Sequence, residues 1–530
     1  MYTFSSKLRM FSIILMVLGA IGIGVGFLST PKNIQEVEKI LAADEHGGGH
    51  GAEAGHDDGK QHDIKDDIDL DAPEKVITRG GEDVTIHDEP QRPADSAVAN
   101  TQVAAERQLD TMHIDTTHVA AAAGGVAQDP GQHGSATNPA NDHVDSKEVK
   151  ADAHAEHQEH LEHVFHQLQN KPWAALYVAC IFFMLVTLGV LAFYAIQIVA
   201  QAGWSPVLFR VMHAITAYLL PGSIIFFILL CLSGFHVNHL FVWMTDGITD
   251  PASEHYDKLI ANKSGYLNVP FWLIRAAIFL IGWNLFRFFS RKNDLAQDDA
   301  TDNINYKKNF KLAAAFLVFF IVTESIMSWD WIMSLDPHWF STLFGWYVFA
   351  SFFVSGITTI CLVTLYLKNK GYLPHVNTSH IHDLAKFMFG ISVFWTYLWF
   401  SQFMLIWYAN IPEEVTYFVT RIEYYNLPFF GAVVMNFLFP ILILINTDFK
   451  RITWILVMAG TVILLGHYID FFNMIMPSTV GTQWFIGIPE ISSVLFFLGL
   501  FIFVVFTALT KAPLLPKRNP FIEESKHFHY

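Results

Sequence analysis

Long stretches of apolar residues, separated by short polar connections, dominate this chain. Ten of them reach the length of about 20 residues that an α-helix needs to cross a bilayer. They cover residues 10–28, 173–201, 207–233, 269–289, 311–334, 341–367, 383–408, 426–446, 452–472 and 490–509. The pattern predicts an all-α polytopic membrane protein with ten transmembrane helices.

The first apolar stretch has two interpretations. Lys7 and Arg9 precede it, as basic residues precede the core of a signal peptide. However, the following "VGFLSTPKN" offers no cleavage site of the small-x-small type, and the run "GAIGIGVGF" has glycines that allow close helix packing. We therefore interpret residues 1–30 as an uncleaved N-terminal transmembrane anchor.

A long acidic segment follows the anchor. Between Pro31 and Pro172, 29 Asp and Glu oppose 11 Lys and Arg, a net charge of −18 where the whole chain carries −16. Residues 31–165 are of low complexity and hold more than half of the 25 histidines, with too few apolar residues for a core. Five histidines are spaced by three residues before the second helix, namely His154, His157, His160, His163 and His166. This spacing winds around a helix, so we favour a solvated, pH-sensitive linker over a zinc or nickel site.

The basic residues predict the orientation, because Lys and Arg concentrate in cytoplasmic loops. With a cytoplasmic N-terminus, the cytoplasmic side receives Arg291, Lys292, Lys307, Lys308, Lys368, Lys370, Lys450, Arg451, Lys511, Lys517 and Arg518. The short loops on the opposite side contain only Lys258, Lys263 and Arg421. We expect both termini in the cytoplasm, the 31–165 loop in the periplasm, a nine-helix membrane core over 166–515 and a cytoplasmic tail over 516–530.

Ionisable side chains within the predicted helices are the first candidates for function, because charge is costly in a bilayer. Glu324 lies near the middle of the fifth helix, and Asp330 follows six residues later, nearer the outer surface. A carboxylate at such depth is kept neutral, paired or hydrated. We expect both residues to carry protons; the structural alternative is a protonated Glu324 that bonds a neighbouring helix.

Further relay candidates lie toward the same outer side. Asp336 precedes Pro337, and the pair is also explained as the N-cap and first turn of the sixth helix. His338 follows, at the expected membrane boundary. His467 and Asp470 are three residues apart on one face of the ninth helix, where an imidazole and a carboxylate can share a proton.

Two candidates complete the set. Glu490 opens the tenth helix on the outer side, and His213 lies in the inner third of the third helix, below a kink expected at Pro221. The candidate relay residues are therefore Glu324, Asp330, Asp336, His338, His467, Asp470, Glu490 and His213. We expect no catalytic residue, metal site or redox cofactor in this chain, because Cys180, Cys231 and Cys361 form no CxxC motif and no histidine pair matches in depth.

The segment "SWDWIMSLDPHWFSTLFGW" resembles one of the two related large membrane subunits of alternative complex III, a bacterial quinol:cytochrome c oxidoreductase, and the resemblance extends over about residues 173–515. It implies a fold similar to the membrane subunit of polysulfide reductase. In that fold, helices two to five and six to nine form two consecutive four-helix bundles, and helices one and ten are peripheral.

The resemblance also implies partners and a location. The partners would be multihaem and monohaem cytochrome c subunits, an iron–sulfur subunit and a homologous quinol-binding membrane subunit, in the inner membrane of a Gram-negative bacterium. Haem c and iron–sulfur clusters would lie in those partners, and no nucleic acid is involved. We expect a cofactor-free scaffold with a proton path. The alternatives are a chain that itself binds quinol, at Glu324 or Asp330, and a secondary transporter with inverted repeats, for which only Pro221-Gly222 offers a helix break.

Overall fold

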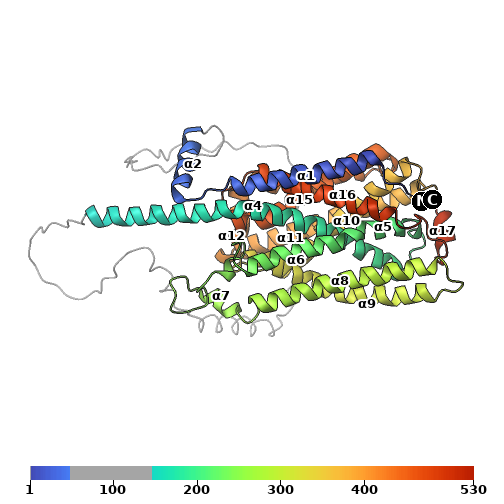
Figure 1. Ribbon diagram of the computed structural model, residues 1–530, viewed down its shortest axis with the longest axis horizontal. Coiled ribbons are helices and arrows are strands. Elements are labelled where there is room, and N and C mark those ends of the chain that lie inside the picture. The colour runs from blue at the N-terminus through green and yellow to red at the C-terminus, as the bar shows by residue number, and fades with distance from the viewer. Residues whose placement is uncertain (1, 48–145, 530) are drawn as a thin grey trace, which may run out of the picture. The chain divides into compact units, whose positions relative to one another are not determined.

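The computed structural model describes residues 2–47 and 146–529, and every regular element in these two ranges is helical (Figure 1). Ten helices are long and apolar enough to cross a membrane, which confirms the predicted all-α, multi-pass membrane protein. Both described chain ends lie at the same end of the helices, which we call the terminal end. The opposite end, with α7 and α12, is called the loop end.

Two groups of four membrane spans follow each other along the chain. The first group consists of α4 (Ser146–Val199), a broken span made of α5 (Phe209–Ile215) and α6 (Leu219–Gly234), α8 (Val269–Gln297) and α9 (Ile304–Trp331). The second consists of α10 (Phe344–Asn369), α11 (Thr378–Ala409), a span made of α13 (Asn426–Val433) and α14 (Phe439–Leu444), and α15 (Thr453–Val480). The remaining two spans are α1 (Ser6–Leu28) and α16 (Ile488–Leu509).

Short elements connect or cover these spans. The short α-helices are α2 (Ile34–Gly47), α7 (Lys258–Lys263), α12 (Pro412–Glu423) and α17 (Ile522–Lys526). Single 3₁₀ turns occur at η1 (Pro206–Leu208), η2 (Thr216–Tyr218), η3 (Val242–Met244), η4 (Met333–Leu335) and η6 (Phe449–Arg451), and η5 (Val434–Leu438) is a π-helix.

The first helices of the two groups, α4 and α10, form the centre of the membrane part. In the most apolar 18-residue stretch of each helix, 94% of the residues of α4 and 89% of those of α10 are buried, whereas only 22% are buried in α1. Gly189 of α4 and Gly356 of α10 allow the two backbones to touch. A Cβ atom at Gly189 would lie only 2.6 Å from the carbonyl oxygen of Phe352. Small residues are the usual means of close helix packing in lipid, and here they join the two groups.

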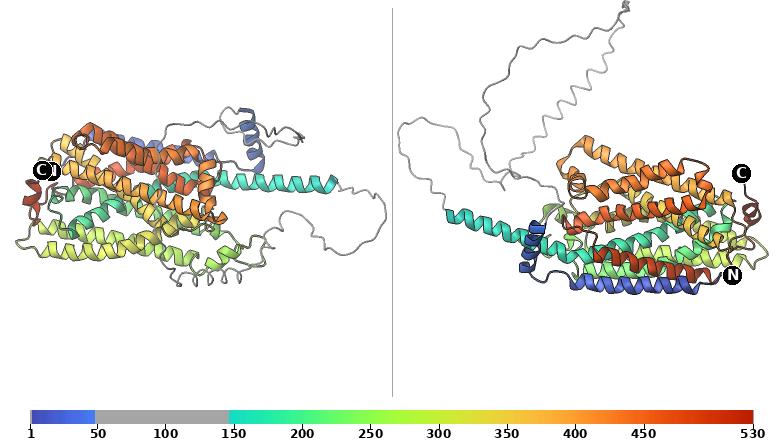
Figure 2. Two further views of the ribbon diagram at one scale, coloured as in Figure 1. Left: turned by 180° about the vertical axis from the view of Figure 1, so that it is seen from behind. Right: turned by 90° about the horizontal axis from the view of Figure 1, so that it is seen from above.

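Packing within each group completes the architecture. In the second group, α10 contacts α11 and α15, and α13 contacts α15; in the first, α8 contacts both α6 and α9. Outside both groups, α1 runs along α16 (Figure 2). The contacts agree with the expected two consecutive four-helix bundles, which we call the first and second bundle, and with a peripheral pair of helices.

Two spans are interrupted one turn before a proline. In the third span, η2 separates α5 from α6 just ahead of Pro221, and in the eighth span η5 precedes Pro440. Proline has no N–H to donate and crowds the preceding turn, which accounts for both interruptions. The kink expected near Pro221 is thus an interrupted helix. Sequence reasoning did not predict the π-helix, which buries Asn436.

The segment after α1 contains more helix than expected. In α2, Val37 packs against Leu161 and Val164 of α4, which starts at Ser146 and continues through Pro172. The segment has few apolar residues and no core of its own. Apolar residues on one face of a helix can nevertheless be buried when that face packs against a second helix. The side chains of His154 and His157 lie outside the described residues.

The C-terminal segment closes the terminal end. Ser525 donates its hydroxyl to the carbonyl of Trp204 at 2.6 Å, and the Nε2 atom of His380 lies 2.9 Å from the Ser525 carbonyl oxygen. The backbone N–H of Lys517 donates to Asp298 at 2.9 Å. The expected cytoplasmic tail therefore contacts α8 and α11, and so links the two bundles.

Candidate functional site

The centre of the second bundle contains a buried carboxylate that accepts hydrogen bonds from three side chains. Asp470 of α15 is only 2% exposed. Its Oδ1 accepts from the hydroxyl of Tyr347, and its Oδ2 accepts from Ser351 Oγ and from the indole N–H of Trp395, both at 2.9 Å. Helices α10, α11 and α15 therefore meet at one acid group.

Local helix geometry explains part of this convergence. Tyr347 and Ser351 are four residues apart on α10, and His467 and Asp470 are three apart on α15, so each pair shares one helix face. Because α10 packs against both α15 and α11, the two helix faces and Trp395 of α11 come together. Sequence reasoning found His467 and Asp470 but missed the other three, although Tyr347 and Ser351 carry a detectable signal in their spacing.

Ser351 bridges the histidine and the aspartate. Its Oγ lies 2.9 Å from His467 Nδ1, whereas Nδ1 and Asp470 Oδ2 are 3.8 Å apart. With the Ser351 proton donated to Asp470, His467 must donate from Nδ1, and its Nε2 then carries the lone pair. Nε2 is buried without a partner among the described residues. The imidazole and the carboxylate are thus connected through a hydroxyl that can both donate and accept.

A small polar cavity adjoins Tyr347 on the loop-end side. It measures about 10 Å³, room for about one water molecule, and Gln402, Arg421 and Asn473 contribute to its lining. Each of these three has one buried polar atom with no partner among the described residues, namely Nε2, Nη2 and Oδ1. The cavity supplies the two to four polar partners that a buried water needs, so it can extend the network beyond Tyr347.

Arg421 reaches this cavity from the short amphipathic helix α12. Its Nε donates to the Asn473 carbonyl at 3.0 Å, and its guanidinium lies 3.3 Å from the ring centre of Tyr417. Sequence reasoning treated this arginine as an ordinary loop cation. Its burial, with 3% exposure, becomes visible only once α12 packs against α11 and α15.

Asp330 belongs to a closed ion pair in the first bundle. Arg275 binds it through two atoms, with Nε 2.7 Å from Oδ2 and Nη2 3.0 Å from Oδ1. Neither side chain is exposed by more than 8%. This paired, dehydrated geometry is that of a structural anchor between α8 and α9. The sequence feature that could have indicated this ion pair is Arg275, the lone cation within the apolar run "FWLIRAAIF".

Glu324 stands apart from both arrangements. It is 1% exposed, its Oε1 accepts from Ser325 Oγ at 2.8 Å, and its Oε2 has no partner among the described residues. It lies on α9 where this helix crosses α10, beside the contact of Ser325 with Gly345. In the described part of the chain, no chain of hydrogen bonds connects it to Asp330 or to Asp470.

Asp336 does not cap the sixth helix, so that interpretation was wrong. The helix α10 begins at Phe344, and Asp336 and Pro337 lie in the connection between η4 and α10. In this connection, Trp339 stacks on Tyr417 of α12, with ring centres 4.1 Å apart, and this contact holds the connection in a non-helical conformation. The carboxylate of Asp336 instead accepts from a backbone N–H two residues later, at 3.3 Å.

His338 forms an ion pair at the loop end, far from the helix interior. Its Nε2 lies 2.5 Å from Oδ2 of Asp257, whose other oxygen caps α7 through the N–H groups of Leu259 and Ile260. Partial burial acts to raise the pKa of Asp257, but the hydrogen bonds from His338 and from the backbone outweigh it, so this pKa lies below its usual value. His338 therefore supports the loop fold.

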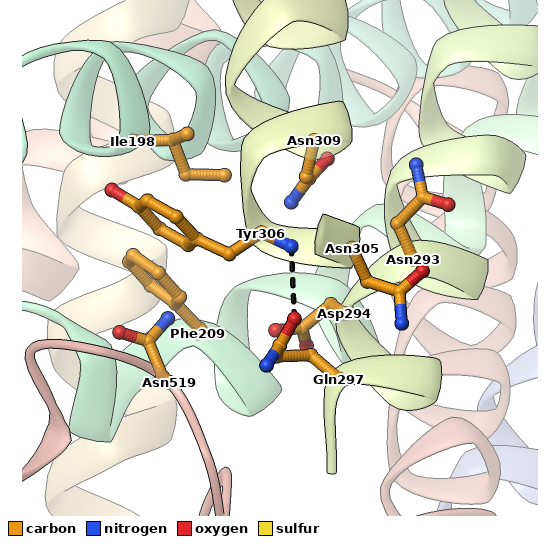
Figure 3. Close-up of a pocket in the computed structure, with 9 residues that line it drawn as sticks. All are labelled: Ile198, Phe209, Asn293, Asp294, Gln297, Asn305, Tyr306, Asn309 and Asn519. Atoms are coloured by element: carbon orange, nitrogen blue, oxygen red, sulfur yellow. Dashed lines mark hydrogen bonds between the residues drawn. The ribbon is translucent and has the colours of Figure 1, made fainter. Parts of the chain in front are cut away.

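His213 lies at the terminal end of the first bundle, within a buried ionic cluster. Asp294 Oδ2 lies 3.3 Å from both Arg210 Nη1 and His213 Nε2, and the contact with His213 lacks hydrogen-bond alignment. Arg210 also pairs with Asp298 at 2.8 Å. Figure 3 shows Asp294 beside Gln297, at a pocket of about 10 Å³ that Asn309 also lines. The cluster holds α5 to α8, away from the Asp470 network.

Glu490 opens α16, as predicted, because its Oε2 accepts from the backbone N–H of Gly487 at 2.9 Å. The eight candidates thus fall into separate places, and only His467 and Asp470 come together. Within the described residues, no three His, Cys, Asp or Glu side chains are arranged to hold a metal ion.

Comparison of the chain with protein-family models and with curated proteins finds no match.

Proposed function

We propose that this chain is an integral membrane subunit of a bacterial quinol:cytochrome c oxidoreductase of the alternative complex III type, and that its second bundle conducts protons. The Asp470 network carries the proposal of proton conduction. The segment Ser328–Trp346 supports the assignment to the complex, in which cytochrome c, iron–sulfur and quinol-binding membrane subunits would hold the cofactors. The membrane would be the bacterial inner membrane, with the loop end in the periplasm.

The hydrogen bonds define an order of transfer. A proton enters from the polar cavity near Arg421 and is taken up by the Tyr347 hydroxyl as this hydroxyl gives its own proton to Asp470. Ser351 then turns its hydroxyl from Asp470 to His467, accepts the proton of the protonated acid and donates its own proton to Nδ1 of His467. This transfer uses the tautomer of His467 that carries its proton on Nε2, and it leaves His467 as an imidazolium. The steps from the Tyr347 hydroxyl to His467 join groups within hydrogen-bond distance, which proton transfer requires.

A comparison within the chain argues against a purely structural Asp470. Asp330, which is structural, is neutralised by direct contact with Arg275. Asp470 accepts only from neutral donors, and no described Lys or Arg pairs with it. Contact with a cation therefore does not hold Asp470 in a structural ion pair, as it holds Asp330.

The transporter alternative predicts discontinuous helices at corresponding positions of two repeats. The interruption in the first bundle falls in its second span, at η2, whereas the π-helix of the second bundle falls in its third span, at η5. These positions do not correspond, which argues against a transporter built from two such repeats.

Affinity purification of this chain from its native membrane tests the assignment. We expect c-type haem and iron–sulfur subunits to copurify; a chain that purifies without haem contradicts membership of the complex. In proteoliposomes, Tyr347→Phe is expected to lower the number of protons moved per electron. Tyr177→Phe is the matched control, because Tyr177 is also buried but donates only to the Trp331 carbonyl. Equal proton movement in the two variants contradicts the proposed path.

A further inference from the structure

A second and much larger cavity lies outside the second bundle, between α4, α13, α15 and α16. It measures about 670 Å³, within the range of pockets that bind small molecules. On α16 its lining begins at Glu490, in the first turn at the loop end, and ends at Leu498, near the middle of the span; on α13 it extends likewise from Leu427 to Met435. Each stretch rises roughly 12 Å at ~1.5 Å per residue, and one leaflet contributes roughly 15 Å of hydrocarbon. The cavity therefore lies at the depth of the acyl chains of the leaflet at the loop end.

The cavity opens sideways, between membrane helices. Leu427 and Ile491 line it and are 79% and 52% exposed. The rest of the lining is almost entirely apolar and includes Phe182, Phe472 and Trp484. A space with this lining and this opening accepts an acyl chain, which enters from the lipid.

Two polar groups in the lining have no partner. The Oε1 atom of Glu490 and the hydroxyl of Tyr468 form no hydrogen bond with any described residue. Glu490 is 2% exposed, and its Oε2 accepts from the Gly487 N–H at 2.9 Å. Buried polar groups require partners. A ligand must therefore bring a donor for the carboxylate and a polar group for the phenol.

A cation lies beside the mouth of the cavity. Lys171 of α4 is half-buried, and its Nζ lies 5.6 Å from the ring centre of Phe485. Both chain neighbours of Phe485, Trp484 and Ile486, line the cavity. Lys171 is within electrostatic range of Glu490 but does not satisfy it, because Oε1 has no partner among the described residues. The loop-end mouth therefore presents one negative and one positive side chain near each other.

These two charges select the head group. A phospholipid ammonium can donate to Glu490 while its phosphate faces Lys171, and an ester carbonyl can accept from the Tyr468 hydroxyl. A choline head group has no N–H to donate. A head group with only negative charge is repelled by Glu490, and an uncharged ring leaves Lys171 without an anion. A phospholipid that carries an ammonium with N–H groups meets all three requirements.

We infer that this cavity binds a membrane phospholipid with a primary ammonium head group, as in phosphatidylethanolamine. The ammonium binds Glu490, the phosphate binds Lys171, and an acyl chain lies between α13 and α16. The lipid fills the gap between the peripheral α16 and the second bundle. The inference does not rest on proton conduction, since Tyr468 lines this cavity whereas its neighbour His467 contacts Ser351 inside the bundle.

Four variants separate the contributions. Glu490→Gln keeps an acceptor for the Gly487 N–H but removes the charge that selects an ammonium. Lys171→Gln removes the cation that faces the phosphate, which every phospholipid carries. Gly431→Trp fills the cavity, because Gly431 lines it and an added Cβ atom would meet no other atom within 4 Å. Gly390→Trp is the matched control, because Gly390 also has open space but lines a different pocket.

The test uses native mass spectrometry of the delipidated, purified protein, titrated with dioleoyl-phosphatidylethanolamine or dioleoyl-phosphatidylcholine. We expect the unmodified protein to bind the ethanolamine lipid about tenfold more tightly, equivalent to about 1.4 kcal/mol. Glu490→Gln should abolish this preference, whereas Lys171→Gln should weaken the binding of both lipids and keep the preference. Gly431→Trp should lose the tightly bound ethanolamine lipid, and Gly390→Trp should retain it. Equal affinity of the unmodified protein for the two lipids, or tight binding that survives in Gly431→Trp, overturns the inference.

Mass spectrometry of the lipids that copurify from the native membrane examines the same site without added lipid. The unmodified protein and Gly390→Trp should retain equal amounts of phosphatidylethanolamine, and Gly431→Trp should retain less. If Gly431→Trp instead loses only quinone or only an anionic phospholipid, the head group is wrong and the inference fails. Neither measurement involves proton movement or haem, so failure here is distinct from failure of the proposed function.

Discussion

Replacing Asp470 by asparagine is expected to stop proton transfer and leave the fold intact. Asparagine keeps the size of aspartate and one acceptor oxygen, but it cannot take up a proton. With this oxygen in the place of Oδ2, the hydrogen bonds from Ser351 and Trp395 are retained. The amide nitrogen then faces the Tyr347 hydroxyl, whose proton loses its acceptor.

The structural cost of this change follows from the hydrogen bonds. One of three bonds to a charged acceptor is lost, which costs about 1.5–3 kcal/mol. Domains are typically stable by about 5–15 kcal/mol, so the protein should still fold and assemble. Loss of a positioned proton carrier lowers transfer by about 10²-fold or more. The two effects therefore differ enough to be separated.

Proteoliposomes with a pH-sensitive dye measure proton movement, and haem reduction measures turnover in the same sample. Thr323→Val controls for lost stability, because Thr323 accepts a buried hydrogen bond from Trp283 at 3.0 Å in the first bundle. We expect the Asp470 variant to lose proton movement and the Thr323 variant to retain it. Normal proton movement with Asp470→Asn would refute the path and leave Asp470 with a structural role.

Three further predictions concern stability. Arg275→Ala should lower the thermal unfolding midpoint, because it leaves Asp330 buried and unpaired at a cost of about 3–5 kcal/mol; an unchanged midpoint would contradict the anchor role. Gly189→Leu should prevent the two bundles from packing and abolish the monodisperse gel-filtration peak, and a normal peak would contradict the proposed contact. The depressed pKa of Asp257 means that its pairing with His338 stabilises the loop above the unfolded pKa of about 3.9, and that this stabilisation is lost as pH falls through the lower folded pKa. Limited proteolysis of the loop should therefore accelerate at acidic pH in the unmodified protein and show less pH dependence in Asp257→Asn.

Helix number was predictable because the length of an apolar run is a local property, and a bilayer demands about 20 such residues wherever they occur. Helix ends were less predictable. The helix α4 starts at Ser146 and packs against α2 through Leu161 and Val164, and α10 starts at Phe344, after a connection in which Trp339 stacks on Tyr417 of α12. Both contacts join residues that are distant along the chain.

The roles of the candidate residues were likewise predictable only in part from the sequence. The sequence alone determined that His467 and Asp470 share a helix face and that Asp330 is a costly charge. Helical periodicity and position within an apolar run are both properties of a single continuous segment, so they can be recognised without the tertiary structure. Only the tertiary structure decided what each charge meets. Asp330 pairs with Arg275, 55 residues away, and becomes an anchor, whereas Asp470 accepts from Tyr347, 123 residues away, and pairs with no Lys or Arg of the described ranges. The role of a buried acid depends on these partners, and the packing of helices brings them within reach.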